Sequence, residues 1–225
     1  MTLIVLYGGG LDSAALVEYL VSGLSLRPGL VYIDWGCKAR RGEKDSLHLT
    51  AAHHRLRFDM IDCVDFCSTL FSTSPLIQAN MVHDHAQNYV PFRNLLFATI
   101  AGAYCARIRD AAIGLGFHAE PEGSVYHDAK REFLEQLNSL MRFSYPDHQV
   151  RFFAPFARLE RWQYLAKAME TRPGIFEETF SCYESGRPSE CGRCTHCVQK
   201  RELKVRAVEA LKSKLGTWGD EPCVE

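Results

Sequence analysis

The stretch YGGGLDSAALVEYL (residues 7–20) follows the apolar run TLIVL (residues 2–6) almost at the N-terminus. Three glycines, an aspartate and a serine therefore separate a strand pattern from a helical pattern. In an open parallel sheet, ligands bind beyond the carboxyl ends of the strands. A glycine-rich turn there exposes backbone N–H groups, and the helix that follows adds the positive end of its dipole. The stretch thus predicts an anion-binding loop between the first strand and the first helix.

Short apolar runs and longer helical patterns alternate along the rest of the chain. The apolar runs predict strands at Thr2–Tyr7, Leu30–Asp34, Phe58–Cys63, Ala111–Gly116 and Arg151–Ala154. The periodic stretches predict helices at Ser13–Val21, Glu43–Arg57, Arg93–Arg109, Ala129–Phe143, Arg161–Thr171 and, in the tail, Val198–Leu215. Strands that alternate with helices are typical of parallel βαβ units. We therefore expect an α/β fold with a doubly wound, mostly parallel sheet, and a long loop at Asn80–Pro91.

The known classes of phosphate loop differ in the residues that follow their glycines. A Walker loop ends in Gly-Lys-Ser/Thr, and a dinucleotide-binding loop needs a third glycine where Ser13 stands, so neither pattern fits. Ser13 is expected to donate its hydroxyl to a phosphate oxygen. Asp12 would repel a bare phosphate, so we expect it either to cap the helix or to help hold Mg²⁺. The alternative is a tight turn that needs glycine only for its backbone.

The composition is that of an ordinary globular domain. Of the 225 residues, 47% are hydrophobic and 24% are charged, which is enough for a sizeable core. The formal net charge of −1 gives no electrostatic reason to expect nucleic acid as a partner. The apolar runs are shorter than a bilayer span, so no membrane contact is expected. Nine cysteines, an odd number, do not suit a secreted disulfide framework, which favours a cytoplasmic protein.

Four cysteines near the C-terminus have the spacing of a metal site. Eight, two and two residues separate Cys182, Cys191, Cys194 and Cys197. Two-residue gaps allow thiolates from one turn to converge on a single ion, and the more distant cysteine completes a tetrahedron. A Cys-x-x-Cys redox pair would leave two thiols unexplained, and His196 is poorly placed to replace a sulfur. The pattern predicts a structural Zn²⁺ in a small appendage (residues 181–225) that follows an α/β domain (residues 1–180).

Several stretches resemble one enzyme family. GGGLDS (residues 8–13) resembles the Ser-Gly-Gly-x-Asp-Ser loop of the ATP pyrophosphatases, the PP-loop superfamily, which cut ATP to AMP and pyrophosphate while adenylating a substrate. Four further stretches, in order along nearly the whole chain, resemble 7-cyano-7-deazaguanine synthases. These are DWGCKARRGE (residues 34–43), YVPFRNLLF (89–97), SVYHDAKREF (124–133) and SCYESGRPSECGRCTHC (181–197).

The resemblance implies a ligase that activates a carboxylate. Such an enzyme would bind ATP with Mg²⁺, adenylate a 7-deazaguanine carboxylate, and let a nitrogen nucleophile displace AMP. With ammonia the product is an amide and then the nitrile used for queuosine. A second interpretation transfers the acyl group to a protein amine, since some relatives occur in bacterial anti-phage operons. A third is a catalytically inactive, zinc-stabilised scaffold that binds nucleotide. The resemblance also implies a homodimer.

The same resemblance assigns site residues motif by motif. The catalytic residues are Asp12, Ser13, Lys38 and Arg93. The nucleotide is expected at Gly8, Gly9, Gly10, Leu11, Asp12, Ser13, Asp34, Asn94 and Gly116. Arginine suits phosphate neutralisation, and an aspartate after the second strand suits a ribose contact. The deazaguanine acid is expected at Phe92, Tyr126, His127, Asp128 and Lys130.

The chain departs from the family pattern in the expected pocket. Gly8 replaces the first serine of the loop, and Phe92 replaces glycine in the Val-Pro-Gly-Arg-Asn stretch. Cys-Arg of the family is replaced by Ala129 and Lys130, and Cys37 stands where the family has glutamine. The zinc-spaced cysteines show no such change. This pattern favours related chemistry on an altered substrate or acceptor.

Overall fold

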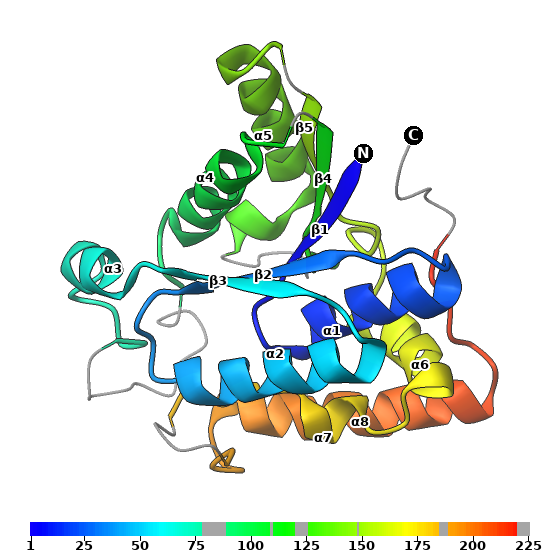
Figure 1. Ribbon diagram of the computed structural model, residues 1–225. Helices are drawn as coiled ribbons and strands as arrows, with labels where there is room; N and C mark the ends of the chain where they lie inside the picture. The colour runs from blue at the N-terminus through cyan, green and yellow to red at the C-terminus, as the bar shows by residue number, and fades with distance from the viewer. Residues whose placement is uncertain (78–88, 109, 120–125, 148, 185–188, 220–225) are drawn as a thin grey trace.

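Five parallel strands form the central sheet of the computed structural model, in the order β3-β2-β1-β4-β5 (Figure 1). They are β1 (Thr2–Leu6), β2 (Gly29–Asp34), β3 (Phe58–Asp62), β4 (Asp110–Gly114) and β5 (Gln149–Phe153). The central strand is β1, where Ile4 lies opposite Gly29 of β2 and Ile113 of β4. The strand order reverses beside β1, so its carboxyl end lies at the switch point where such sheets bind ligands. The doubly wound α/β fold is confirmed.

The structure describes residues 1–77, 89–108, 110–119, 126–147, 149–184 and 189–219. Most of the predicted loop Asn80–Pro91 lies outside these ranges. Within them, no helix is both long enough and apolar enough to cross a membrane.

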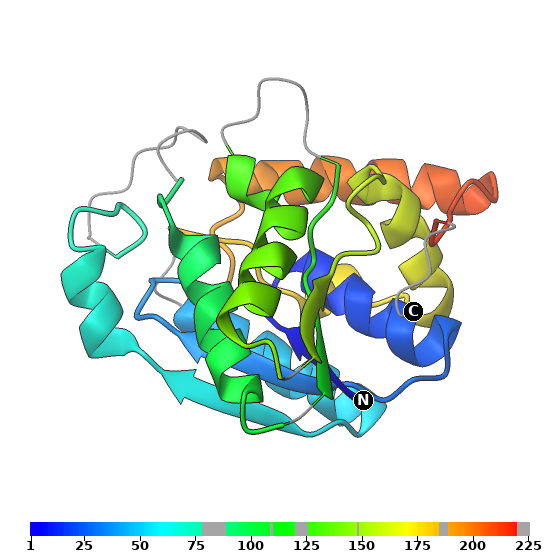
Figure 2. The ribbon, with the colours of Figure 1, turned by 90° about the horizontal axis from the view of Figure 1, so that it is seen from above.

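Helices cover both faces of the sheet (Figures 1 and 2). One face carries α1 (Leu11–Glu18), α2 (Arg40–His54), α6 (Arg161–Thr171), α7 (Ile175–Glu178) and α8 (Thr195–Lys212). The other face carries α4 (Arg93–Cys105) and α5 (Arg131–Ser144), seen from above in Figure 2. Consecutive residues of β1 therefore enter different cores, Val5 on the α1 side and Ile4 on the α4 side. Burial on both faces explains why β1, β2 and β4 read as largely continuous apolar runs.

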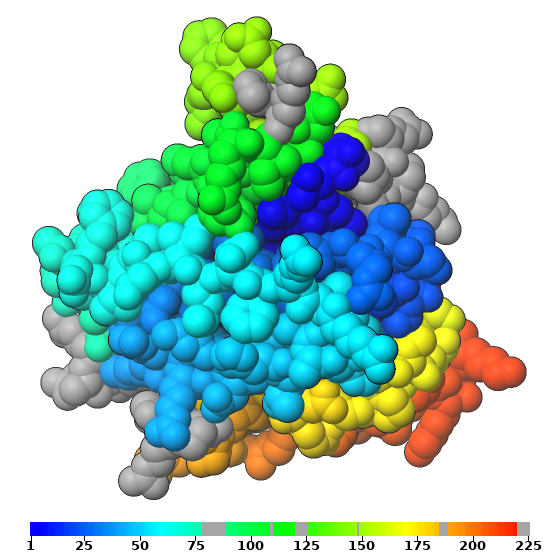
Figure 3. All heavy atoms as spheres, in the orientation of Figure 1, coloured from blue at the N-terminus to red at the C-terminus, as the bar shows by residue number. Residues whose placement is uncertain are grey.

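Three short elements complete the fold. A π-helical turn, η1 (Tyr19–Gly23), continues α1, a 3₁₀ turn, η3 (His127–Ala129), precedes α5, and α3 (Val64–Leu70) follows β3. The sequence pattern did not predict α3. The edge strand β3 and helix α2 make up much of the face seen in Figure 3.

The predicted helix bounds shift where backbone conformation overrides periodicity. Helix α2 begins at Arg40 and ends at His54, because Arg55 adopts a left-handed conformation with φ of 52°. Helix α6 spans the predicted residues, and it begins with a capping box between Glu160 and Gln163. Helix α8 packs along α6, and Leu203, Ala207 and Ala210 join the core on this side of the sheet. The division of the chain at residue 180 stays a prediction.

Candidate active site

The glycine-rich loop lies between the end of β1 and the start of α1, as predicted. Gly9 has φ of +78°, and a Cβ there would lie 2.5 Å from Cα of Glu43 in α2. Its carbonyl accepts the N–H of Phe180 at 3.0 Å. Glycine is required at this position both by the backbone conformation and by the close approach of α2. Gly8 differs, because it is exposed and no atom lies within 4 Å of a Cβ placed on it.

The first turn of α1 presents its backbone at the carboxyl edge of the sheet. Gly10 is the N-cap residue, and the hydroxyl of Ser13 donates to its carbonyl at 3.1 Å. A Cβ on Gly116, just beyond β4, would lie 2.9 Å from the backbone nitrogen of Ser13. Gly116 therefore allows the end of β4 to approach α1 closely. The first-turn N–H groups have no partner within their own helix, and so this helix start suits an anion.

Asp12 does not cap α1, because the N-cap position belongs to Gly10. Its carboxylate instead faces α6, where Arg161 donates from Nε to Oδ1 at 2.9 Å and from Nη2 to Oδ2 at 3.0 Å. The hydroxyl of Tyr164 donates to Oδ1 at 2.5 Å. Burial alone would raise the pKa of Asp12, but the positive charges of Arg161 and His118 hold it below the usual value. The sequence reasoning identified neither Arg161 nor Tyr164.

A buried carboxyl group, that of Glu43, lies against the loop. Glu43 is 9% exposed, and its Oε2 accepts the hydroxyl of Tyr32 at 2.8 Å. The thiol of Cys37 lies 3.5 Å from the same oxygen. Burial raises the pKa of Glu43 to about 6, and it raises that of the Cys37 thiol well above its usual value. The replacement of glutamine by Cys37 thus falls on a buried polar cluster that supports Gly9.

Two other predicted residues contact protein groups on the neighbouring elements. Asp34 is buried at the end of β2 and forms ion pairs with Lys44 and, at 3.4 Å, with Arg40. Lys38 donates from Nζ to the carbonyl of Pro75 at 3.0 Å. Burial lowers the pKa of Lys38, while the carboxylate of Glu184 opposes the shift. Neither Asp34 nor Lys38 forms a hydrogen bond with the described glycine-rich loop at residues 8–13.

The start of α4 meets the segment before α5. The Nδ2 of Asn94 donates to the backbone carbonyl of Asp128 at 3.2 Å, and Arg93 stacks 5.5 Å from the ring centre of Trp35. Asp128 is 9% exposed. In the part of the chain that the structure describes, its Oδ1 is the one buried side-chain polar atom that has no hydrogen-bond partner. Burial raises the pKa of Asp128, against the positive charge of Arg93. Buried polar atoms without a partner are rare in native proteins, so this oxygen is an acceptor that the described protein groups leave unused.

The remaining residues predicted to contact the acid lie on the two segments that lead into α4 and α5. Phe92 is the N-cap of α4, with φ of 63°, and the residue is 75% exposed. Tyr126 lies edge-on to Tyr89, with ring centres 5.8 Å apart. His127 is exposed, and Lys130 is the N-cap of α5.

The four zinc-spaced cysteines converge on one point. All four Sγ atoms lie within 4.8 Å of one another. The Sγ atoms of Cys191 and Cys197 lie 3.9 Å apart, and those of Cys194 and Cys182 lie 4.0 Å apart. A tetrahedron of thiolates around one Zn²⁺, with Zn–S bonds of about 2.3 Å, has edges of about 3.8 Å. The backbone N–H of Cys191 and that of Cys194 also point at sulfurs at 3.4 Å. Gly192, with φ of +73°, supplies the expected tight turn.

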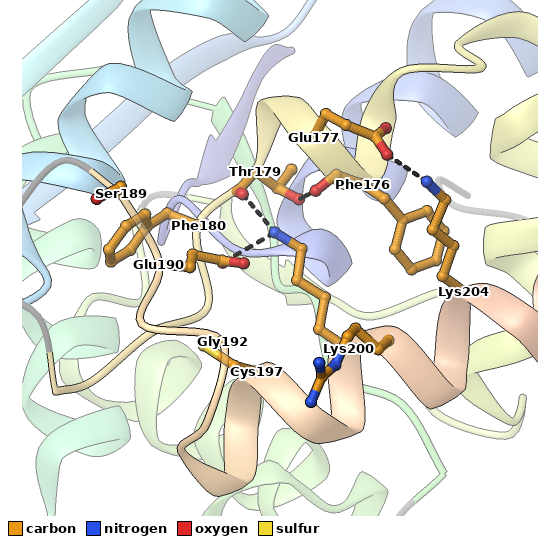
Figure 4. A pocket seen from close by; sticks show the side chains of 11 residues that line it. Phe176, Glu177, Thr179, Phe180, Ser189, Glu190, Gly192, Cys197, Lys200 and Lys204 are labelled. Atoms are coloured by element: carbon orange, nitrogen blue, oxygen red, sulfur yellow. Dashed lines mark hydrogen bonds and ion pairs between the residues drawn. The ribbon is translucent and has the colours of Figure 1, made fainter.

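A cavity of about 450 Å³ lies between α7, α8 and the segment that precedes the cysteines (Figure 4). Its buried ammonium group, Nζ of Lys200, donates to the carbonyl of Thr179 at 2.6 Å and to Glu190 at 2.9 Å. Apart from Cys197, none of the residues predicted for the site lines this cavity.

Comparison with known proteins identifies the family. A model of the family "Queuosine biosynthesis protein QueC" matches residues 2–206, which include the loop, the Arg93–Asn94 pair and all four cysteines. The chain belongs to the QueC family.

Several 7-cyano-7-deazaguanine synthases are similar in sequence to this chain. The 7-cyano-7-deazaguanine synthase of Campylobacter curvus is 27% identical over 225 residues, covering 94% of this chain and 96% of that protein. The synthase of Pyrococcus furiosus is 31% identical over 126 residues, which cover 53% of this chain and 51% of that protein. Among solved structures, the U34-tRNA thiolase NcsA from Methanococcus maripaludis, with its [4Fe-4S] cluster, has a TM-score of 0.49 at 12% identity. That match covers 95% of this chain and 67% of that one.

Proposed function

We propose that this QueC-family chain adenylates the carboxylate of 7-carboxy-7-deazaguanine with ATP, releasing pyrophosphate, and then joins the activated acyl group to a nitrogen nucleophile. The observation that carries the proposal is the family match across residues 2–206. The fold supports it, because the glycine-rich loop lies at the switch point of the sheet. Adenylation helps because AMP is a far better leaving group than oxide.

The nucleotide would lie over the loop and the first turn of α1. The backbone N–H groups there and the hydroxyl of Ser13 would bind phosphate oxygens, and Gly116 keeps the end of β4 close to this turn. Asp34 ends β2, the strand next to β1, and is the candidate ribose contact. Mg²⁺ would neutralise phosphate charge, and Arg93 would do so at the reacting carboxylate.

The ring of the acid would bind beside Asp128. A guanine-type ring carries two adjacent N–H donors, one on the ring and one on the exocyclic amine, and a carboxylate can accept such a pair. The orphaned Oδ1 of Asp128 supports this role. Phe92 offers an exposed aromatic ring for stacking. Tyr126, His127 and Lys130 lie on the same short segment as Asp128.

The four cysteines would hold one structural Zn²⁺. Their sulfur spacing leaves room for a single ion, and four protein ligands leave no open position for a substrate. The metal would therefore stabilise the fold around α8 and take no part in the reaction.

The proposal has two versions, which differ in the nitrogen nucleophile that attacks the activated acid. Free ammonia would give the amide and nitrile of a 7-cyano-7-deazaguanine synthase. A protein amine is favoured by the rim of the site, where Phe92 holds an exposed ring in a left-handed conformation at a position that is glycine in the family. We therefore infer that nitrile formation from ammonia is slow.

The test is to incubate the protein with Mg-ATP, 7-carboxy-7-deazaguanine and ammonium, and to follow pyrophosphate and the acyl products by mass spectrometry. AMP and pyrophosphate with little nitrile support the altered acceptor. Rapid nitrile formation would restore ammonia as the acceptor. A folded protein that binds ATP without acid-dependent pyrophosphate release would refute the activity and favour a nucleotide-binding scaffold.

A further inference from the structure

The ion pair between Asp12 and Arg161 joins two segments that are 149 residues apart in the sequence. Asp12 lies in the first turn of α1, and Arg161 is the first residue of α6. The pair is bidentate, and Tyr164 adds a third bond to the carboxylate. The ring of Tyr164 is itself fixed by stacking on Phe156, at 4.2 Å and 6°. The geometry holds a planar guanidinium beside the loop.

The loop lacks a positive charge of its own. Residues Gly8–Ser13 contain no lysine or arginine, and Asp12 adds a negative charge where phosphates are expected. Arg161 cancels that charge, and His118, which follows Gly116, also contributes positive charge at Asp12 when protonated. The dipole of α1 then remains available to an anion.

The pair differs from a purely structural arginine contact in the same protein. Arg172 is 1% exposed and is enclosed with Glu178 at 2.6 Å and Glu18 at 3.7 Å. The Arg161 side chain is 30% exposed and that of Asp12 is 24% exposed. Two of the five N–H groups of Arg161 bond Asp12, and Nη1 takes no part in that pair. Arg161 is thus both anchored and open to solvent at the loop.

We propose that Arg161 binds the β and γ phosphates of ATP and the pyrophosphate that leaves, with Asp12 and Tyr164 positioning its guanidinium. This inference rests on the proposed function and deepens it, because it names a residue beside the loop whose remaining N–H groups can bond the phosphates. A guanidinium fork suits this role, since it can bond a carboxylate on one edge and a phosphate on another.

The experiment measures the binding of pyrophosphate, ATP and AMP, each with Mg²⁺, to wild type, Arg161→Lys and Arg161→Gln by calorimetry. Loss of a phosphate contact should weaken pyrophosphate and ATP by at least about tenfold, while AMP changes by less than about threefold. Arg161→Lys should fall between, because it keeps the charge and loses the fork. Arg206→Gln is the matched control, since Arg206 pairs with exposed Glu160 at 3.2 Å beside the same helix.

A double variant separates phosphate binding from a structural role. Asp12→Asn with Arg161→Gln removes both charges and leaves no unpaired ion. If Arg161 only neutralised Asp12, the double variant would recover wild-type affinity for pyrophosphate, and the proposal would fall. Unchanged pyrophosphate affinity in a folded Arg161→Gln protein would also overturn it.

No deazaguanine acid is needed in these binding measurements. If Arg161→Gln weakens pyrophosphate while the wild type fails to activate the acid, the phosphate role stands and the proposed reaction fails. A wild type that binds neither ATP nor pyrophosphate would sink both.

Discussion

Ionisation of the buried carboxyl of Glu43, next to the loop, should lower the stability of the fold by a measurable amount. Its carboxyl is 9% exposed, and burial is the largest influence on its acidity. Burial raises the pKa of Glu43 from 4.5 to about 6, although Tyr32, Cys37 and Arg93 act in the opposite direction. The folded protein therefore binds this proton more tightly than the unfolded chain does. The contribution of Glu43 to the stability of the fold falls as the pH rises from about 4.5 to about 6 and is constant above that range.

The change Glu43→Gln removes this titration while keeping an oxygen that can accept the hydroxyl of Tyr32. A shift of about 1.5 pH units corresponds to about 2 kcal/mol once the carboxyl is ionised in both states. The variant should thus exceed wild type in free energy of unfolding by about 2 kcal/mol at pH 8 and by less than about 1 kcal/mol at pH 5. Wild type and variant are compared at the same pH, so that any pH dependence of metal binding by the four cysteines affects both proteins equally.

Urea unfolding followed by circular dichroism, at pH 5 and pH 8, measures both differences. Glu135→Gln is the control, because Glu135 is 59% exposed and pairs with Arg131 on the surface of α5. Its stability should change by less than about 0.5 kcal/mol with little pH trend. A Glu43→Gln variant that is less stable than wild type at pH 8 would refute the reasoning, since it would show that the ionised carboxylate is net stabilising.

Further variants probe the metal, the rim and the loop. Wild type is expected to hold one zinc per chain, and metal analysis of Cys194→Ser should show that this zinc is lost. The variant should also unfold at a lower temperature, because structural metal binding is part of the folding free energy. Well-folded wild type without zinc would contradict this. Phe92→Gly should raise the free energy of unfolding by up to about 1 kcal/mol in urea, because glycine accepts φ of 63° without strain; a clear loss would show that the ring packs in the native state. Gly9→Ala should abolish ATP binding, because its Cβ would lie 2.5 Å from Glu43. Gly8→Ser should instead fold normally and bind ATP at least as tightly, since open space surrounds it and serine restores a donor.

Periodicity and the known behaviour of parallel sheets were enough to predict the fold. The run at residues 2–6, the glycines after it and the next helix define one βα unit, and its repetition predicts the sheet. Strand bounds differ by only one or two residues, because the apolar runs of β1, β2 and β4 are largely buried, although the edge strand β3 is not. Helix α3 was missed, since Val64–Leu70 is short, with Phe66 57% and Leu70 54% exposed. Cys67 is the one buried residue of this helix, so there is little amphipathic signal to read.

The site was only partly predictable, for a different reason. Cysteine spacing is local, so Cys191, Cys194 and Cys197 could be grouped from the sequence alone. The bond between Arg161 and Asp12 depends on the packing of α6 against α1, and no local pattern encodes it. Glu43 did stand in a quoted motif, and the signal that could have identified it is the carboxylate at the start of a helix that directly follows β2.

The departures from the family pattern have different physical consequences. These consequences indicate which departure is expected to change the chemistry. Gly8 removes a hydroxyl where nothing else is displaced, so its effect is confined to one phosphate contact. Phe92 is different, because a bulky residue retains a left-handed backbone that costs about 1–2 kcal/mol relative to glycine. Its exposed ring gains little from packing in return. Strain of this kind persists mainly where function requires it. Because Phe92 adjoins Arg93, and Asn94 binds the segment of Asp128, the rim at Phe92 is where we expect the acceptor of this protein to differ from ammonia.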